Sequence, residues 1–314
     1  MEHSTGVAGV AGAGEPPEAA GRTILTLIVL LLCSTVADNA QSQVKSVSNP
    51  AAGRNYFIVA HQDDWQLFMG DVAVRTLGSR APATFIYLTA GDDGRDSSYW
   101  KARERAAIAS TRLATEPLIV ASDSIKCEPV TILAHVIRKC SFGTTSSYFL
   151  RIPDGRRNGT GFARYDHQSM RRLRANTISG VAAVDGSTVY ESWDDLAKTV
   201  SSLIDTTGGQ ILVHTMDPSV IVNPHDHFDH RMAGLLIADL RKWRPLDVRY
   251  YVGYALSTRA ANRSNDQARQ KTAVFLAYDQ EMVRSNKDWS AYREHPAFYS
   301  DCMVRTYARS PRAR

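Results

Sequence analysis

Residues 56–64 read Tyr-Phe-Ile-Val-Ala-His-Gln-Asp-Asp, and this stretch decides the fold that we expect for the 314-residue chain. Its five leading residues, 56–60, are typical of a buried strand. Helical spacing of apolar residues follows over 67–77, and residues 83–89 (ATFIYLT) read as a second buried strand. Strands that alternate with helices over short loops predict an α/β fold with a mostly parallel sheet.

The rest of the chain continues this alternation. We expect further helices over 99–113, 193–204, 228–243 and 266–282, and further strands over 148–152, 210–214 and 248–252. Residues 123–190 are the least regular part and are predicted to hold a β-rich insertion. Because the sequence contains no internal repeat and no convincing break, it predicts one domain over 55–300.

The chain begins with a leader-like segment, in which an apolar run over 24–37 follows Arg22. A membrane-spanning helix needs about 20 apolar residues, whereas the core of a signal peptide needs about 7–15. We therefore predict a signal peptide or an uncleaved N-terminal anchor over 1–40, and a polar linker over 41–54. The protein would then be exported, either secreted or periplasmic, or held at the membrane by that anchor.

Composition places the chain among ordinary globular proteins, with 44% hydrophobic and 22% charged residues. These values exclude a disordered, collagen-like or coiled-coil chain. The net charge is +5, and four arginines without any acidic residue fall within 305–314, in a basic tail that we place at 301–314. Because no Lys/Arg stripe alternates with aromatic residues, we expect no nucleic-acid partner. The basic character instead suggests contact with an anionic cell envelope.

The four cysteines are too few for a disulfide scaffold. In an oxidising compartment Cys127 and Cys140 could close a short loop and leave Cys302 free, but the sequence leaves this pairing open.

His61, Asp63 and Asp64 form a first cluster of chemically active side chains. They follow the first strand directly, and ligands of open α/β sheets bind at the carboxyl ends of the strands. His61 and Asp64 are three residues apart, so a turn that begins at His61 could aim both at one ion and leave Asp63 free as a base. The alternative, a helix N-cap, accounts for one aspartate only.

Residues 225–230 (HDHFDH) form the second cluster and hold three of the nine histidines. Histidine and aspartate are common zinc ligands, and a catalytic zinc site uses three protein ligands with one open position for water. Two ligands from the first cluster and one from the second would satisfy that count. A set of two histidines and one aspartate could also accept iron or cobalt.

The same six residues allow another interpretation. The pattern H-x-H-x-D-H looks like the motif of the metallo-β-lactamase fold, which needs more histidine and aspartate ligands downstream. Only 84 residues follow His230, and His295 is the only later histidine. That interpretation also leaves the first cluster without a role, so we set it aside.

Taken together, the two clusters resemble a known enzyme family. Residues 60–64 (AHQDD) resemble the A-H-x-D-D signature of the LmbE-like, or PIG-L, de-N-acetylase superfamily, and 227–231 (HFDHR) resemble its second motif. Residues 89–95 (TAGDDGR), 99–104 (YWKARE) and 150–155 (LRIPDG) also fit. The resemblance covers about 55–285 and looks closest to exported bacterial members. It implies a Rossmann-like three-layer sandwich.

The resemblance also implies a role for each motif residue. Three residues would bind one zinc ion: His61, Asp64 and His230. Asp63 would be the general base, and His227 would stabilise the oxyanion and protonate the leaving amine, with Asp229 orienting it. The implied reaction is amide hydrolysis that releases acetate from an N-acetylated sugar or glycoconjugate.

Some positions depart from the family pattern or allow more than one role. Trp65 stands where many members have glutamate, and it could form a wall of the substrate pocket. His225 stands where some members have tyrosine. Asp93, Arg95 and Arg103 could line the sugar site, or they could be turn residues and a solvated helix face.

Two other functions remain open at this point. The same fold could hydrolyse a different amide, such as a long-chain acyl amide, or the protein could be a non-catalytic glycan-binding module. The presence of Asp63, the expected base, argues against the module.

Overall fold

The structure is a computed structural model, and it describes residues 53–115, 124–205, 207 and 209–311. The expected signal peptide or anchor (1–40) and nearly all of the expected linker (41–54) lie outside these residues. Among the helices that the structure describes, none combines the length and the apolar character needed to cross a membrane.

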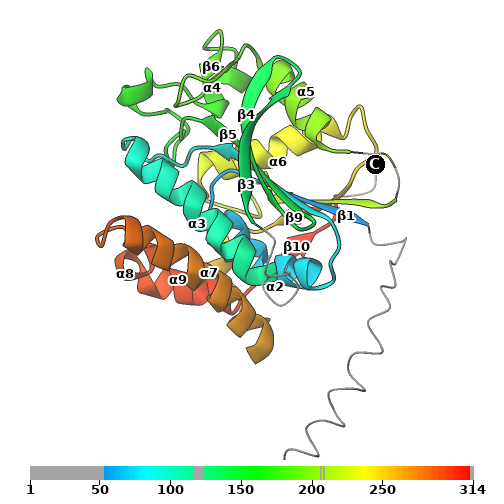
Figure 1. Cartoon of the computed structure of the whole chain (residues 1–314), viewed down its shortest axis with the longest axis vertical. Coiled ribbons are helices and arrows are strands. Elements are labelled where there is room, and N and C mark those ends of the chain that lie inside the picture. Colours follow the sequence, from blue (N-terminus) through cyan, green and yellow to red (C-terminus); the bar gives the residue numbers. More distant parts are fainter. Residues whose placement is uncertain (1–52, 116–123, 206, 208, 312–314) are drawn as a thin grey trace, which may run out of the picture. The chain divides into compact units, whose positions relative to one another are not determined.

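An eight-stranded sheet forms the middle layer, with the strand order β10-β9-β8-β1-β2-β5-β4-β3 (Figure 1). Five adjacent strands are parallel: β1 (Arg54–Val59), β2 (Ala83–Thr89), β5 (Thr145–Ile152), β8 (Ile211–Met216) and β9 (Asp247–Tyr251). Three antiparallel strands complete the edges: β3 (Lys126–Ile132), β4 (His135–Phe142) and β10 (Ala308–Arg309). The predicted α/β fold with a mostly parallel sheet is confirmed.

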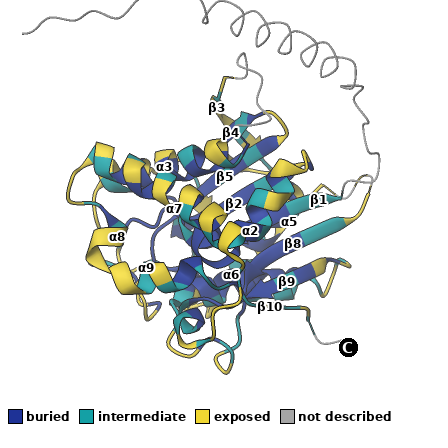
Figure 2. Cartoon of the chain, turned by 90° about the horizontal axis from the view of Figure 1, so that it is seen from below, coloured by how far each residue is buried: buried dark blue, intermediate teal, exposed yellow. Residues whose placement is uncertain are grey.

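Helices cover both faces of the sheet (Figure 1), and their outer surfaces are exposed while the strands between them are buried (Figure 2). One face carries α2 (Asp64–Gly78), α3 (Ser97–Thr115) and α7 (Asn265–Ser285). The other carries α4 (Met170–Arg174), α5 (Trp193–Leu203) and α6 (Phe228–Leu240). The remaining short elements are η2 (Ala163–Tyr165), β6 (Val181–Ala182), β7 (Val189–Tyr190), η3 (Tyr254–Thr258), α8 (Ala291–Glu294) and α9 (Pro296–Met303).

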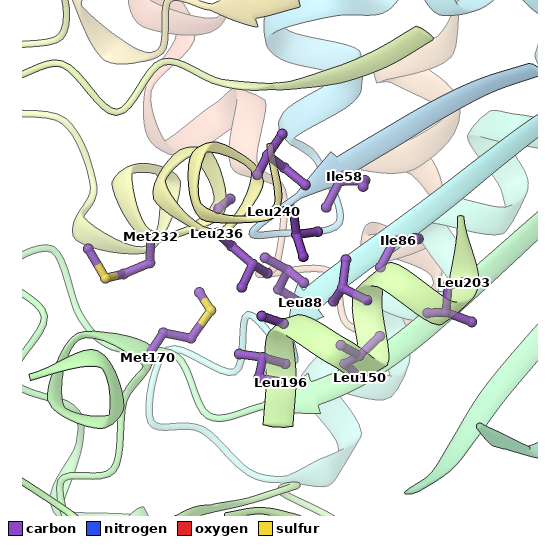
Figure 3. Close-up of a cluster of buried hydrophobic side chains, with 14 of the residues drawn as sticks. Ile58, Ile86, Leu88, Leu150, Met170, Leu196, Leu203, Met232, Leu236 and Leu240 are labelled. Carbon is purple, nitrogen blue, oxygen red and sulfur yellow. The ribbon is translucent and has the colours of Figure 1, made fainter. Parts of the chain in front are cut away.

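Successive side chains of β1 enter two different hydrophobic cores, because neighbouring residues of a strand point to opposite faces. Phe57 and Val59 pack in the core beneath α2 and α7, whereas Tyr56 and Ile58 pack in the core beneath α5 and α6. Figure 3 shows the second core, where side chains of β1, β2, α5 and α6 meet: Ile58, Ile86, Leu196, Leu236 and Leu240. Burial on both faces explains why this strand is apolar without alternation.

All the strands and helices predicted individually occur, and their ends differ from the expected ones by at most three residues. The irregular segment 123–190 contains β3 and β4, which extend the sheet as an antiparallel hairpin, and the small β6–β7 pair. Cys127 and Cys140 are direct partners across this hairpin and form a disulfide. Cys302 is buried and free.

The structure describes residues 301–311 of the expected basic tail, 301–314, and part of this segment is helix and strand. Residues up to Met303 belong to α9, and β10 pairs with β9. The arginines there have acidic partners: Arg305 Nη1 lies 2.8 Å from Asp301 Oδ1, and Arg309 Nη2 lies 2.8 Å from Asp217 Oδ1. Because Asp217 is fully buried, it needs a cation nearby, and the tail supplies one.

Candidate metal centre

Three side chains from two neighbouring strand ends converge on one point. His61 and Asp64 follow β1, and His230 lies in the first turn of α6, which follows β8. His61 Nδ1 is 3.2 Å from His230 Nε2, His230 Nε2 is 3.0 Å from Asp64 Oδ1, and His61 Nδ1 is 3.5 Å from Asp64 Oδ1. All three residues are buried.

These separations fit a tetrahedral metal site. Nitrogen and oxygen ligands lie about 2.0–2.1 Å from zinc, which places two ligand atoms of a tetrahedron roughly 3.3–3.4 Å apart. The three observed separations, 3.0–3.5 Å, fall on both sides of that value. The donor set of two imidazoles and one carboxylate therefore fits a divalent metal with one position left for water.

Neighbouring groups hold the three side chains in place. The backbone N–H of His61 donates to Asp64 Oδ2 over 2.7 Å. His230 Nδ1 lies 3.0 Å from Asp226 Oδ1, which also accepts a hydrogen bond from the backbone N–H of Tyr254. A carboxylate on the far nitrogen of a histidine orients the ring for metal binding. From the sequence, Asp226 could either support a metal ligand or be a polar loop residue, and the structure places it in contact with His230.

Electrostatics in the cluster favour charged groups despite burial. Burial alone would raise the pKa of Asp64, but the His230 and His61 imidazoles hold it well below its usual range. Burial alone would lower the pKa of His230, but the Asp64 and Asp226 carboxylates raise it to about 10. A metal that binds here therefore displaces a proton.

Asp63 faces the same cavity but is held by a different partner. Its Oδ1 accepts a hydrogen bond from Arg103 Nη2. Arg103 also donates to the carbonyl of Gly91 over 2.9 Å and to the hydroxyl of Tyr278 over 2.8 Å. Although Asp63 directly precedes α2, its side chain makes no capping hydrogen bond in the described structure. The helix-cap alternative therefore does not explain this residue.

His227 lies on the opposite wall, with its ring centroid 4.6 Å from that of His61. Its Nδ1 accepts a hydrogen bond from the backbone N–H of Asp229 over 3.2 Å, so the ring proton sits on Nε2. The Asp229 carboxylate is 3.8 Å from that Nδ1 and instead accepts from the backbone N–H of Gly155 over 2.7 Å. Burial lowers the pKa of His227 well below its usual range, and His61 and His230 add to this effect.

Asp154 is a buried carboxylate that the sequence analysis did not single out. Its Oδ2 is 3.5 Å from His61 Nε2, and its Oδ1 is 3.6 Å from His227 Nε2. Burial raises the pKa of Asp154 to about 7, and Asp229 adds to the shift while His61 opposes it. The sequence signal was Pro153-Asp154-Gly155 at the end of a strand, which reads as a simple turn.

A second group of four side chains could also hold a metal: His61, Asp154, His227 and Asp229. It shares His61 with the first group. Its His–Asp pairs lie 3.5–3.8 Å apart, whereas two of the three separations in the first group are 3.0 and 3.2 Å. The tighter convergence favours the first group as the metal centre.

A polar cavity of about 310 Å³ opens over these residues, and its lining includes His61, Asp63, Asp64, Asp93, Arg95, Arg103, Asp154 and His227. Asp93 and Arg95 form an ion pair of 3.3 Å, with about half of each side chain exposed. Arg103 lies deep in the cavity wall. These polar side chains line the cavity and suit hydrogen bonding to a ligand with several hydroxyl groups.

Two expected site residues lie elsewhere. Trp65 is fully buried, donates to the Tyr87 hydroxyl over 3.0 Å and packs on Phe85, so it is a core residue and not a pocket wall. His225 is exposed and lines a neighbouring groove instead of the polar cavity.

Comparison with known proteins identifies the family to which most of the site residues' sequence belongs. The sequence model of the family described as GlcNAc-PI de-N-acetylase (PIG-L) matches residues 56–240. None of the curated proteins compared with the sequence matches it significantly.

Three solved structures are similar at low identity. A deacetylase triple mutant (Orf2*T) of the teicoplanin biosynthetic pathway has 15% identity and a TM-score of 0.44, covering 79% of this chain and 88% of that one. The zinc-inhibited form of teicoplanin deacetylase Orf2 has 14% identity and a TM-score of 0.43, with 77% and 93% covered. N,N'-diacetylchitobiose deacetylase from Pyrococcus horikoshii has 14% identity and a TM-score of 0.40, with 95% and 93% covered.

Proposed function

The chain belongs to the PIG-L family, and from that membership we propose that it is a zinc-dependent hydrolase that removes the N-acetyl group of an N-acetylated sugar or glycoconjugate. The observation that carries the proposal is the convergence of His61, Asp64 and His230 within 3.0–3.5 Å of one another. When bound there, zinc supplies a Lewis acid that activates water and polarises an amide carbonyl.

Asp63 is the residue placed to take the proton of the attacking water. Its carboxylate lines the cavity beside the metal ligands, and Arg103 holds it in one orientation. General-base assistance by a positioned carboxylate contributes about 10²–10⁴-fold to the rate.

His227 is placed to assist on the other side of the amide. Since its Nδ1 accepts from the backbone of Asp229, its proton is on Nε2, which lies 3.6 Å from Asp154 Oδ1 among the residues that line the cavity. A hydrogen bond from Nε2 would stabilise the negative charge that develops on the carbonyl oxygen and would hold a proton near the leaving amine. The polar residues Asp93 and Arg95 would contact the sugar hydroxyls, whereas Arg103 would hold Asp63 in place.

The test combines metal analysis with product detection. We expect the purified full-length protein to hold close to one zinc per chain and to release acetate from N-acetylated chito-oligosaccharides. Asp63→Asn should keep the metal and lose at least about 100-fold in kcat. His61→Ala should lose both, whereas Asp247→Asn on the surface should change neither. A protein that binds no divalent metal, or an Asp63→Asn variant with full activity, would refute the proposal.

We also propose that the enzyme is exported, on two grounds. The apolar run over 24–37 has the length of a signal-peptide core, and the Cys127–Cys140 disulfide suits an oxidising compartment. Fractionation of cells with N-terminal sequencing of the recovered protein tests this. A mature N-terminus near residue 38 or 41 outside the cytoplasm is the expected result, an intact N-terminus in the membrane fraction indicates the anchor, and a cytoplasmic protein with the intact leader contradicts export.

A further inference from the structure

A second, less polar hollow lies beside the polar cavity. This groove has a volume of about 820 Å³ and is formed by the loop before α6, by η3 and by the α8–α9 region. Its apolar lining includes Pro224, Ala255, Pro296, Ala297 and Phe298. Its arginine, histidine and glutamate members are all exposed: Arg157, His225, Glu294 and His295. The side chains of Glu294 and His295 are 67% and 66% exposed. Most of the groove lies outside residues 56–240, the part that matches the family.

The groove and the polar cavity share a wall. Five residues line both: Tyr254, Glu294, His295, Phe298 and Tyr299. The ring centroid of Tyr254 is 5.2 Å from that of the proposed metal ligand His230 and 5.4 Å from that of Phe298. The groove therefore begins directly beside the metal centre.

The strand order places most of the groove on the other side of the metal centre from the polar wall, and of the described residues only Arg157, which follows β5, reaches the groove from the polar side. The metal ligands follow β1 and β8, which are adjacent in the sheet. The polar residues follow strands on one side of this pair, Asp93 after β2 and Asp154 after β5. Tyr254 follows β9 on the other side. The metal centre thus lies between a polar wall and an apolar groove.

An amide that reacts at the metal centre has two substituents that leave the carbonyl group in opposite directions. If the amino sugar occupies the polar wall, the acyl group points toward β9 and the groove. We infer that the groove binds an N-acyl chain and that the preferred substrate carries a fatty-acyl chain longer than acetyl on its amino sugar. This inference rests on the proposed function and adds the acyl class.

The reaction is the same hydrolysis with a larger acyl group. Water adds to the carbonyl carbon, the C–N bond breaks, the acid leaves as a carboxylate and the amine takes a proton. No other reactant is needed. Each additional methylene of the acyl chain that is removed from water and fully buried raises kcat/KM about fourfold. Six more methylenes in a partly open groove should therefore raise kcat/KM at least about tenfold.

The experiment compares acyl length with apolar groups at the other end of the sugar. Zinc-loaded full-length enzyme is assayed for amine release from N-acetyl-, N-butyryl- and N-octanoylglucosamine and from the octyl glycoside of N-acetylglucosamine, all below micelle-forming concentrations. We expect kcat/KM to rise from acetyl to octanoyl by at least tenfold. The octyl glycoside should react no faster than N-acetylglucosamine.

A substitution that fills the groove tests whether the acyl chain binds there. Ala297→Trp, at an exposed position that lines only the groove, should lower the octanoyl-to-acetyl ratio of kcat/KM at least tenfold. Ala175→Trp, an equally exposed position beyond both hollows, should leave that ratio unchanged. Thermal unfolding of both variants checks that they fold.

Three results would overturn the inference. Equal rates for all acyl lengths, a preference for the octyl glycoside, or an Ala297→Trp variant with an unchanged ratio would each show that the groove does not bind the acyl chain. Hydrolysis of N-acetylglucosamine in those cases leaves the proposed function standing. If no amide reacts, the proposed function fails and the inference fails with it.

Discussion

Arg103 connects three parts of the site through one buried side chain. It donates to Asp63, to the Gly91 carbonyl and to the Tyr278 hydroxyl. A lysine would keep the charge but could not make these three contacts, because it lacks the planar fork of a guanidinium group. Arg103 is therefore a positioning residue for the proposed base.

We expect Arg103→Lys to lower kcat on the order of 10- to 100-fold, since small misplacements of a catalytic group have effects of that size. KM should change less, and zinc content should not change. Arg105→Lys is the matched control, because Arg105 is on the same helix but exposed. Steady-state kinetics combined with metal analysis tests this expectation. A loss of zinc in Arg103→Lys that matches its loss of kcat would point to a structural role instead.

Asp226 acts on the metal centre through His230. It holds Nδ1 of that ring over 3.0 Å, which leaves Nε2 to face the other ligands. We expect Asp226→Asn to weaken zinc binding about 10- to 100-fold, the usual effect of losing such a partner. Competition with a fluorescent chelator measures this. His225→Asn, an exposed neighbour, should bind zinc as the wild type does, and equal affinities of both variants would exclude the role of Asp226.

The sequence allowed site residues to be predicted only where several histidines and aspartates stand close together in the chain. His61, Asp64 and His230 stand in dense clusters at strand ends, and the structure brings them together. Asp154 was missed because an aspartate before glycine is an ordinary turn residue until the fold places it beside two histidines. Trp65 was misjudged because proximity to a motif does not tell which way a side chain points, and this one faces the core.

At the scale of elements, a buried lysine ties α7 to two other segments. Lys271 Nζ donates to the carbonyls of Leu67 in α2 and Cys302 in α9, over 2.9 and 2.7 Å, and to Thr306 Oγ1 over 3.0 Å. The side chain is fully buried. Without it, buried carbonyls would lose their donor, so we expect Lys271→Met to reduce the free energy of unfolding by roughly 2–4 kcal/mol.

The same residue predicts a pH dependence. Burial lowers the pKa of Lys271 to about 8, whereas it is about 10.4 in an unfolded chain. Between these values the unfolded state binds more protons, so the stability of the wild type relative to Lys271→Met rises with pH. Urea unfolding at pH 7 and pH 10 measures the difference. Lys242→Met, with an exposed lysine, should show no such dependence, and a difference that shrinks at pH 10 would contradict the lowered pKa.

Elements buried on both faces were predicted well, and edge elements were not. Strands such as β1 and β2 have continuous apolar runs, at 56–59 and 85–88, because helices cover both of their faces. By contrast, β3 is mostly exposed and contains Lys126, Glu128 and Pro129, so its sequence shows no strand pattern. In the same way β10 reads as part of a basic tail, because its pairing with β9 leaves no apolar signature.

At the scale of the whole molecule, two stretches of sequence build one site. Residues 56–240 contain the proposed metal ligands, whereas the later segments hold Tyr254, Tyr278 and the groove. Arg309 joins these stretches near the end of the described chain, since it pairs with Asp217 in the loop that leads from β8 toward the second motif. The C-terminal segment therefore supports the loop on which His227 and His230 depend.

This connection gives the last prediction. Arg309→Ala would leave the fully buried Asp217 carboxylate without its cation, and we expect a loss of roughly 1–3 kcal/mol in unfolding free energy, because Arg309 itself is partly exposed to solvent. Zinc should also dissociate faster. Urea unfolding and chelator-driven zinc release measure the two effects. Arg249→Ala, which breaks an exposed pair with Asp247, is the control. Adding Asp217→Asn to Arg309→Ala should recover part of the loss, because it removes the buried charge, and a further loss would show that the pair is not the cause.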